Sequence, residues 1–220
     1  MVSNAPFIIA IDGPNGSGKG TLARRLGEAL KFPVLDTGLL YRAVGWIVRQ
    51  QGGDIHNEHT ALHAADSMHE LMGLEFLDNK DLRSIESGEA ASIVSVFPSV
   101  RQSLFNLQRN FALHPPNNAR GSILDGRDIG TVICPDATIK LFVTASAEIR
   151  AERRARDQYG DDWQRNFDDV LQQTIIRDKR DSERATAPLK PAEDAIILDT
   201  TALPPDQVLQ KALGLVKAKL

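Results

Sequence analysis

Nine consecutive residues near the start of the chain, from Gly13 to Thr21, include four glycines and one lysine. Glycines let the backbone turn its N–H groups toward an anion. A helix that begins in the same loop adds further N–H groups and a partial positive charge. Lys19 is then placed to reach the β- and γ-phosphates of a nucleotide. The pattern predicts a phosphate-binding loop made of Gly13, Pro14, Asn15, Gly16, Ser17, Gly18, Lys19, Gly20 and Thr21.

The residue after Lys19 narrows the class of protein. In the usual pattern Ser or Thr follows the lysine directly, whereas here Gly20 intervenes and the hydroxyl belongs to Thr21. Gly-Lys-Gly-Thr resembles the loop of nucleoside monophosphate kinases more than that of GTPases or motor ATPases. A GTPase would also need Asn-Lys-x-Asp to specify guanine, and the segment 79–82 has its carboxylate one place too early.

Such a loop requires a strand before it and a helix after it. The run 7–11 is short and apolar, as in a buried strand, and apolar residues recur at helical spacing over 19–30. The same alternation continues along the chain. We expect strands at 7–12, 33–36, 122–125, 138–144 and 195–199, and helices at 19–30, 39–51, 58–71, 100–111, 147–156, 167–185 and 205–220.

Short apolar strands that alternate with helices predict an α/β fold with a parallel five-stranded sheet flanked by helices. In such sheets ligands bind at the carboxyl ends of the strands, and those ends carry Asp12, Asp36 and Asp125 here. We expect one kinase-like domain over residues 1–220 that is interrupted twice. Residues 57–100, with a strand-like run at 74–77, indicate an insert, and the Arg-rich segment 153–166 indicates a mobile lid.

Two further motifs begin where a predicted strand ends. Thr37 is placed either to cap the next helix or to contribute its hydroxyl, together with Arg42, to a second phosphate site. Asp125 is placed either to hold magnesium or to form an ordinary Asp-Gly turn. Both interpretations of each motif remain open on these residues alone.

The segment 177–184 is a run of charges of both signs, which usually marks a solvated helix face. Within it Arg177, Asp181 and Arg184 recur at i, i+4 and i+7. A helix would therefore place two cations and one anion on the same face. The functional interpretation is that this face lines a binding site, and the alternative is that it is solvated.

The composition is consistent with a cytoplasmic globular enzyme. The chain has 220 residues and a formal charge of −3, which argues against a general nucleic-acid binder. The single cysteine, Cys134, excludes an intrachain disulfide and suits a reducing compartment. The N-terminus does not have the pattern of a signal peptide, and no apolar run approaches the roughly 18 residues of a membrane span.

Together these motifs resemble the bacterial cytidylate kinases, along nearly the whole chain. The segments that carry the resemblance are 11–21, 35–42, 90–92 with 97–98 and Arg101, 125–131, and 177–189. The resemblance implies transfer of the γ-phosphoryl group of ATP to CMP or dCMP, with Mg²⁺ as the cofactor. It also implies a core domain, a monophosphate-binding insert and a lid. We expect small-molecule substrates, no nucleic-acid or membrane partner, and a monomer.

Residues that match the family's motifs would take the family's roles. The loop from Gly13 to Thr21 would bind ATP, with Lys19 as a catalytic cation and with Thr21 and Asp125 at the metal. The acceptor phosphate would be bound by Thr37, Arg42, Arg127 and Arg177, the cytosine by Ser92, Arg101 and Asp128, and the sugar by Asp181, which Arg184 braces. Arg153 and Arg154 would close over the transferring group and exclude water, with exposed helix arginines as the alternative.

The chain departs from the family's pattern in its insert. Compared with that pattern, about ten residues of strand-turn-strand are absent between 74 and 84, and a short hairpin cannot stand alone. We therefore expect no stable three-stranded sheet over residues 72–85. A smaller departure is Thr37, which stands where the family commonly has Ser and keeps the hydroxyl.

The choice of base can be argued from chemistry. A carboxylate such as Asp128 accepts a hydrogen bond from the exocyclic amine of cytosine, and Arg101 and Ser92 can donate to its ring acceptors. Uracil would place a carbonyl against Asp128, and a mispaired buried group costs roughly 1–3 kcal/mol.

Three alternatives to this reading concern metal binding and function. His56, His59 and His63 share one helix face, but no partner completes a zinc set, so we interpret them as surface residues. Rival functions are phosphorylation of another acceptor, such as shikimate or a different monophosphate, and a non-enzymatic nucleotide switch. The set of Ser92, Arg101 and Asp128 argues against the first, and the missing guanine motif and the many arginines argue against the second.

Overall fold

The computed structural model describes residues 5–71 and 74–220. The chain divides into two compact units, one formed by the residues up to Leu35 together with Phe111–Leu220, and the other by Asp36–Asn110. The second unit is wider than the insert expected at 57–100. The functional division into core, insert and lid remains a prediction.

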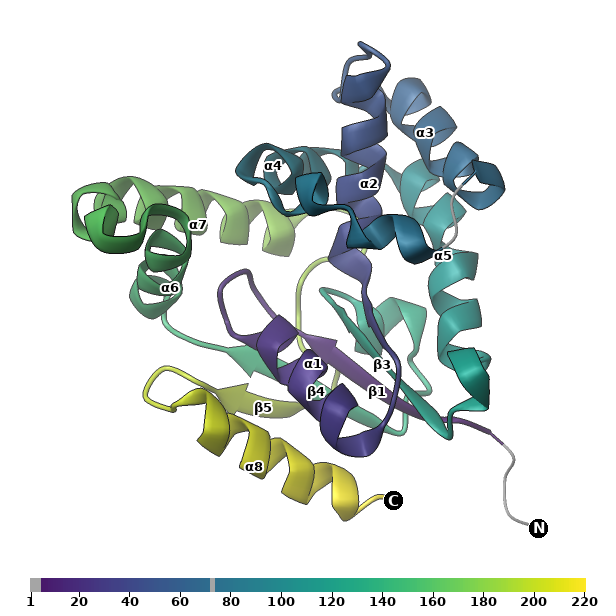
Figure 1. Cartoon of the computed structure of the whole chain (residues 1–220), viewed down its shortest axis with the longest axis vertical. Helices are drawn as coiled ribbons and strands as arrows, with labels where there is room; N and C mark the ends of the chain where they lie inside the picture. The colour runs from purple at the N-terminus through teal and green to yellow at the C-terminus, as the bar shows by residue number, and fades with distance from the viewer. Residues whose placement is uncertain (1–4, 72–73) are drawn as a thin grey trace. The chain divides into compact units, whose positions relative to one another are not determined.

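A five-stranded sheet forms the centre of the first unit, with the strand order β2-β3-β1-β4-β5 (Figure 1). The strands are β1 (Phe7–Asp12), β2 (Val34–Asp36), β3 (Gly121–Gly126), β4 (Ile139–Thr144) and β5 (Ile196–Asp199). β1 pairs in parallel with both β3 and β4, and β4 pairs in parallel with β5. The expected parallel five-stranded α/β fold is confirmed.

The central strand is buried on both faces. Ile8, Ile9, Ala10 and Ile11 are each at most 4% exposed, which explains why β1 reads as a continuous apolar run instead of an alternating one. The helices α1 (Lys19–Leu30) and α8 (Pro205–Lys217) contribute to the same buried cluster as β1 and β4. In the register of the sheet Ile11 lies opposite Asp125, so β1 and β3 end at the same edge.

Two further helices of this unit follow β4. α6 (Ala147–Tyr159) and α7 (Phe167–Glu183) are joined by the 3-10 helix η5 (Gly160–Asn166) (Figure 1). Ala151 and Ala155 of α6 pack against Val170 of α7, with Trp163 at the edge of this cluster. The expected lid, 153–166, thus consists of the second half of α6 and of η5.

The second unit is helical among its described residues. It contains α2 (Thr37–Gln50), α3 (Glu58–Leu71), the 3-10 helices η1 (Leu74–Asp78) and η2 (Lys80–Arg83), α4 (Ile85–Val94) and most of α5 (Pro98–Leu113). α2 and α4 approach closely, because a Cβ built on Gly45 would lie 2.6 Å from the Cβ of Ala90. The glycine therefore fixes how tightly these two helices pack.

The strand-like run at 74–77 is a 3-10 helix, so that part of the prediction is wrong. With no second strand to pair with, a lone strand would leave its backbone groups unsatisfied, whereas the turn lets the N–H of Asn79 bond to the carbonyl of Phe76 at 3.1 Å. No strand occurs over 74–85, as expected for the shortened insert. Residues 72 and 73 lie outside the described part of the chain.

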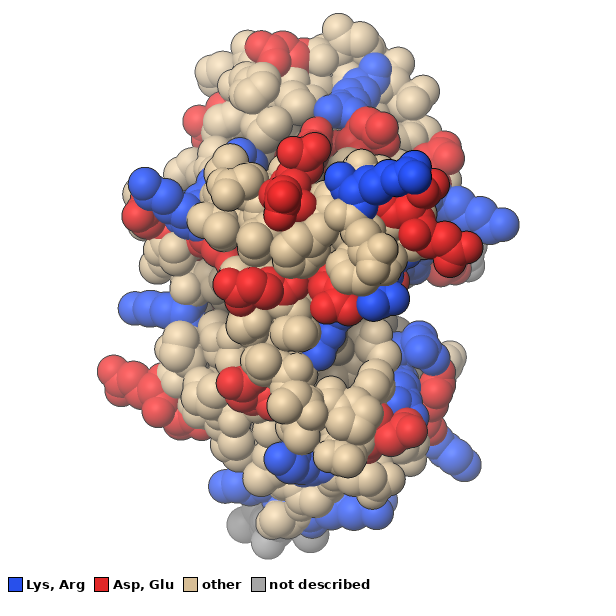
Figure 2. All heavy atoms as spheres, turned by 90° about the vertical axis from the view of Figure 1, so that its left-hand side faces the viewer, with Lys and Arg blue, Asp and Glu red and all other residues tan. Residues whose placement is uncertain are grey.

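The surface carries charges of both signs. Figure 2 shows acidic and basic side chains interspersed over the face that carries α6 and α7 in Figure 1. His56, His59 and His63 are exposed. None of the helices in the described ranges is both long and apolar enough to cross a membrane.

Candidate functional site

The glycine-rich loop joins β1 to α1, as the sequence predicts. Gly16 and Gly18 have positive φ angles of 77° and 88°, which L side chains rarely adopt. A Cβ on Gly13 would lie 2.0 Å from the carbonyl oxygen of Val143, so this position also requires glycine. Gly18 is the N-cap of α1 and makes no side-chain capping bond. The helix N-terminus therefore presents its N–H groups to the loop, which suits a bound phosphate.

Lys19 lies beside the end of β3. Its Nζ is 3.9 Å from Oδ1 of Asp125, and both side chains are nearly buried. A Cβ on Gly20 would lie 3.2 Å from Oδ2 of the same carboxylate, so Asp125 also borders the first turn of α1. Oxygen ligands of this kind suit Mg²⁺. The carboxylate of Asp125 and the hydroxyl of the exposed Thr21 are thus a chemically fitting pair for the metal.

The loop is supported from β5 and α6. The Oγ1 of Thr200, directly after β5, donates to the carbonyl of Ser17 at 2.9 Å. Arg153 donates to the carbonyl and to the Oγ1 of Thr200 at 2.8 and 3.0 Å, and to the carbonyl of Gly16 at 3.5 Å. Arg154 instead donates to Oγ1 of Thr174 in α7 at 2.7 Å. The two lid arginines expected to act together therefore have different surroundings: Arg153 contacts the phosphate loop and Thr200, and Arg154 contacts α7.

Asp12, at the end of β1, fixes the segment that follows β3. Its two carboxylate oxygens accept the backbone N–H groups of Ile129 at 2.8 Å and Gly130 at 2.7 Å. These residues begin the π-helix η4 (Ile129–Ile133). Burial raises the pKa of Asp12 to about 6, although the two N–H bonds oppose this shift. The segment immediately before η4 contains Arg127 and Asp128.

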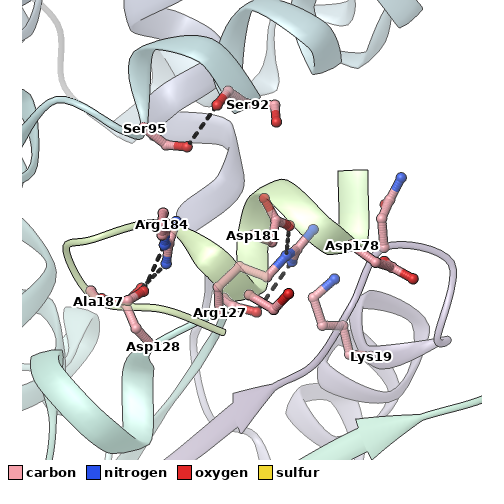
Figure 3. A network of polar contacts seen from close by, with 12 residues as sticks. Lys19, Ser92, Ser95, Arg127, Asp128, Asp178, Asp181, Arg184 and Ala187 are labelled. Atoms are coloured by element: carbon pink, nitrogen blue, oxygen red, sulfur yellow. Dashed lines mark hydrogen bonds and ion pairs between the residues drawn. The ribbon is translucent and has the colours of Figure 1, made fainter. Parts of the chain in front are cut away.

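Arg127 pairs with α7. Its Nε donates to Oδ2 of Asp181 at 3.1 Å (Figure 3). Burial alone would raise the pKa of Asp181, but the charges of Arg127, Arg177 and Arg184 outweigh it and hold the pKa below its usual value. Asp181 is therefore an ionised, buried carboxylate among three cations.

Asp128 lies beside Arg184, with 3.6 Å between Oδ1 and NH2 and both side chains about 6–7% exposed. Nε of Arg184 also donates to the carbonyl of Ala187 at 2.6 Å (Figure 3). The neighbouring charges of the same run, Lys179, Arg180 and Glu183, are exposed. The run therefore has an exposed face and an inward face. Arg177, Asp181 and Arg184, which share the i, i+4, i+7 spacing, lie on the inward face.

The second unit holds the other residues expected to bind the acceptor. Asp36, not Thr37, is the N-cap of α2 and accepts the N–H of Gly38 at 3.0 Å. The capping role suggested for Thr37 is therefore wrong, because the preceding carboxylate takes it; Thr37 is buried in the first turn. Arg42, in the next turn of α2, donates from NH1 to the carbonyls of Leu82 at 2.8 Å and Ser84 at 3.0 Å.

Ser92 and Arg101 are brought together through Ser95. Oγ of Ser95 donates to the carbonyl of Ser92 at 3.2 Å (Figure 3). NH1 of Arg101 donates to the carbonyl of Ser95 at 3.4 Å. The guanidinium of Arg101 also lies 5.6 Å from the ring centre of Tyr41, within the range of a cation–π contact. All three polar residues are buried.

The sequence reasoning missed three residues that the structure places around the loop: Arg150, Asp178 and Thr200. A signal existed for two of them. Thr200 follows β5, at the ligand-binding edge of a parallel sheet, and Arg150 shares a helix face with Arg153 and Arg154 by its i, i+3, i+4 spacing. Asp178 has no such signal, because its partner in α6 lies 28 residues away.

The sequence is similar to known proteins along nearly its whole length. A family model described as cytidylate kinase matches residues 9–218. A cytidylate kinase from Rhodospirillum rubrum is 50% identical over 213 residues, which is 97% of this chain and 98% of the relative. A second, from Xanthobacter autotrophicus, is 51% identical over 213 residues, again 97% of this chain and 98% of the relative.

A solved structure, of an uncharacterized protein from Eubacterium ventriosum ATCC 27560, resembles this chain in fold alone. Its TM-score is 0.51 at 14% identity, over 96% of this chain and 99% of that one. The fold class thus rests on the sheet itself and on this likeness, and the family rests on the sequence matches. The chain belongs to the cytidylate kinase family.

Proposed function

We propose that this chain transfers the γ-phosphoryl group of ATP to CMP or dCMP, and that the residues described above perform the transfer. Membership of the family makes it a nucleoside monophosphate kinase. The observation that carries the assignment of residues is the buried carboxylate of Asp181, which pairs with Arg127 and lies within the charge fields of Arg177 and Arg184, in the same compact unit as Lys19. A cluster of this kind binds an anion such as the acceptor phosphate.

The loop from Gly13 to Thr21 would hold the phosphates of ATP by its N–H groups, with the charge of Lys19 on the β- and γ-phosphates. Asp125 and Thr21 would hold Mg²⁺, which neutralises charge on the transferring group when it is bound. An oxygen of the CMP phosphate forms the new bond to the γ-phosphorus while the bond to the β,γ-bridging oxygen breaks, and ADP leaves. The attacking oxygen is already anionic, so no general base is needed.

Arginines would offset the charge of the acceptor. We assign Arg127 and Arg177 in the sheet unit, with Arg42 and Thr37 in the helical unit, to the CMP phosphate. Asp181 holds the orientation of Arg127, because their 3.1 Å contact is a charge-assisted hydrogen bond. Asp181 would also accept from a sugar hydroxyl, and Arg184 would position Asp128.

The base would be selected by Asp128, Ser92 and Arg101. Asp128 accepts from the exocyclic amine of cytosine, and the two donors bind the ring acceptors. Arg153, which is bonded to the phosphate loop and to Thr200, would act on ATP, and Arg154 would complete the lid formed by 153–166. Closure of this lid would exclude water and so suppress hydrolysis of ATP.

We further propose that the chain acts as a monomer in the cytoplasm, since its assigned residues come from one chain and its single cysteine, Cys134, cannot form an intrachain disulfide. The function is tested by a panel of monophosphates with ATP and Mg²⁺, with ADP formation as the readout. CMP and dCMP should be used well, UMP poorly, and AMP and GMP hardly at all. Equal rates with UMP and CMP would contradict the role of Asp128, and no ADP formation with any monophosphate would contradict the kinase assignment.

A further inference from the structure

Arg150 is a buried arginine of α6 whose hydrogen bonds reach three separate segments. It is 5% exposed. Its Nε donates to the carbonyl of Ala145 at 2.9 Å, and NH1 donates to the carbonyl of Asn15 at 3.2 Å. NH1 and NH2 also donate to the two carboxylate oxygens of Asp178 at 2.9 and 2.6 Å. The guanidinium is thus bonded to the residue that follows β4, to the phosphate loop and to α7.

Each contact constrains a functional element. Asn15 belongs to the loop assigned to ATP, and the next residue, Gly16, packs directly on α6, because a Cβ there would lie 2.9 Å from the carbonyl oxygen of Arg150. Asp178 follows Arg177 and lies one turn before Asp181 on α7 (Figure 3). The same guanidinium therefore holds the ATP loop and the helix that carries two residues assigned to the acceptor, Arg177 and Asp181.

A bidentate arginine–carboxylate pair defines the direction of both partners. If the loop moves, the bond to Asn15 shifts the guanidinium, and the two bonds to Asp178 then turn α7. Because α7 carries Arg177 one residue before Asp178, a small change at the loop alters how Arg177 is aimed. An exposed ion pair would not transmit this constraint, but Arg150 is buried and bonded through all three of its nitrogens.

We infer that Arg150 and Asp178 are positioning residues that couple the ATP loop to the acceptor-binding end of α7, so that each substrate binds more tightly when the other is present. This inference rests on the proposed function. Coupling of this kind is reciprocal, so the factor by which an ATP analogue tightens CMP equals the factor by which CMP tightens the analogue. Neither residue needs to touch a substrate for this role.

The test measures the dissociation constant of CMP by calorimetry, with and without saturating AMP-PNP and Mg²⁺. In the unmodified protein AMP-PNP should tighten CMP by at least about fivefold, the usual lower range of such coupling. In Asp178→Asn the factor by which AMP-PNP tightens CMP should fall below about two, because one oxygen of the bidentate contact is replaced by a donor. AMP-PNP binding in the absence of CMP should change far less than the coupling.

Asp194→Asn is the matched control. It breaks an ion pair of similar length, 2.8 Å to Lys140, in the same unit, and it should keep the full coupling factor. If Asp178→Asn does not fold, Asp178→Glu, which retains the charge but moves the carboxylate, replaces it and should also lose coupling. An unchanged factor in these variants, or a factor near one in the unmodified protein, overturns the inference alone. Failure of the unmodified protein to bind or phosphorylate CMP overturns the proposed function, and the inference with it.

Discussion

The carboxylate of Asp12 accepts the backbone N–H of Gly130 at 2.7 Å, which fixes the end of β1 to the beginning of η4. The contact joins residues 118 positions apart, and it lies directly after the segment that carries Arg127 and Asp128. Oδ2 of Asp12 is also only 3.3 Å from where a Cβ on Gly130 would lie. A side chain at this position would therefore have to displace its neighbours by a few tenths of an ångström. Because Asp12 directly precedes Gly13, the phosphate loop and the segment with Arg127 and Asp128 share one anchor.

The anchor predicts a particular dependence of stability on pH. Because burial raises the folded-state pKa of Asp12 to about 6, against 3.8 unfolded, the folded protein takes up this proton first as pH falls. The contribution of Asp12 to stability therefore decreases as pH rises from about 4 to about 6. Between pH 5 and 7 the unmodified protein should lose about 1 kcal/mol more stability than Asp12→Asn, by linkage. Urea unfolding at both pH values measures this difference, and equal pH dependence in the two proteins would contradict it.

Lys19 should be essential for turnover. It is the cation that the loop itself fixes, and it lies 3.9 Å from Asp125. Lys19→Met should retain the fold and lower kcat by at least about a hundredfold, the scale of one lost transition-state contact. Lys211→Met, at an exposed lysine of α8, is the control and should leave kcat unchanged. Near-normal activity in folded Lys19→Met would be incompatible with the assignment of the loop.

Asp128 should set the preference for cytosine. Asp128→Ala removes the acceptor for the exocyclic amine, so the ratio of kcat/KM for CMP over UMP should fall by about ten- to a hundredfold, the equivalent of 1–3 kcal/mol. Most of that change should come from weaker use of CMP. A preserved ratio in the variant would place base recognition elsewhere.

The elements could be predicted well where burial imposes a clear pattern. All five strands were predicted. For β1 and β3 the reason is burial on both faces, which makes each a short apolar run. α4 was missed, because it buries Ser87 and Ser92 and exposes Ile85, so burial does not follow polarity and the sequence has no helical stripe. The strand-like run at 74–77 was misassigned because a strand needs a partner, which short-range pattern does not reveal.

The site was predictable where its residues are local in sequence. The loop from Gly13 to Thr21 and the face of Arg177, Asp181 and Arg184 follow from spacing alone. The direct partner of Asp181 is Arg127, 54 residues away, and no periodicity relates the two. Contacts of this kind depend on how β3 and α7 pack, so they require the structure.

Gly88 should be needed to position Arg42. A Cβ on Gly88 would lie 3.0 Å from NH2 of Arg42, a distance that side chains do not tolerate without movement, and the bonds of NH1 to Leu82 and Ser84 restrict where the guanidinium can go. Gly88→Ala should therefore raise the KM for CMP several-fold and leave the KM for ATP unchanged. Gly214→Ala is the control, because a Cβ there meets nothing within 4 Å. Equal effects of the two substitutions, or an equal change in both KM values, would refute this role.

The effect of replacing Asp181 distinguishes two interpretations of the charged end of α7, a binding surface and a solvated surface. If it were solvated, neutralising Asp181 would change little, since exposed pairs contribute roughly 0–1 kcal/mol. Asp181 is instead 5% exposed, and the cations around it hold its pKa below the usual value. Removal of the carboxylate would leave Arg127 without its 3.1 Å partner and misdirect Arg177.

Asp181→Ala should therefore lower kcat/KM with both CMP and dCMP, while Glu183→Ala, at an exposed position on the same helix, should not. The comparison of the two nucleotides separates two roles. Equal losses indicate that Asp181 acts by orienting the arginines, and a larger loss with CMP indicates a contact with the 2′-hydroxyl, which dCMP lacks. A larger loss with dCMP indicates a contact that matters more when that hydroxyl is missing. Because the carboxylate is ionised by its cationic neighbours, its contribution should be present at neutral pH and be lost only as pH falls through its lowered pKa. Unchanged kinetics with both nucleotides would return the end of α7 to the role of a charged surface.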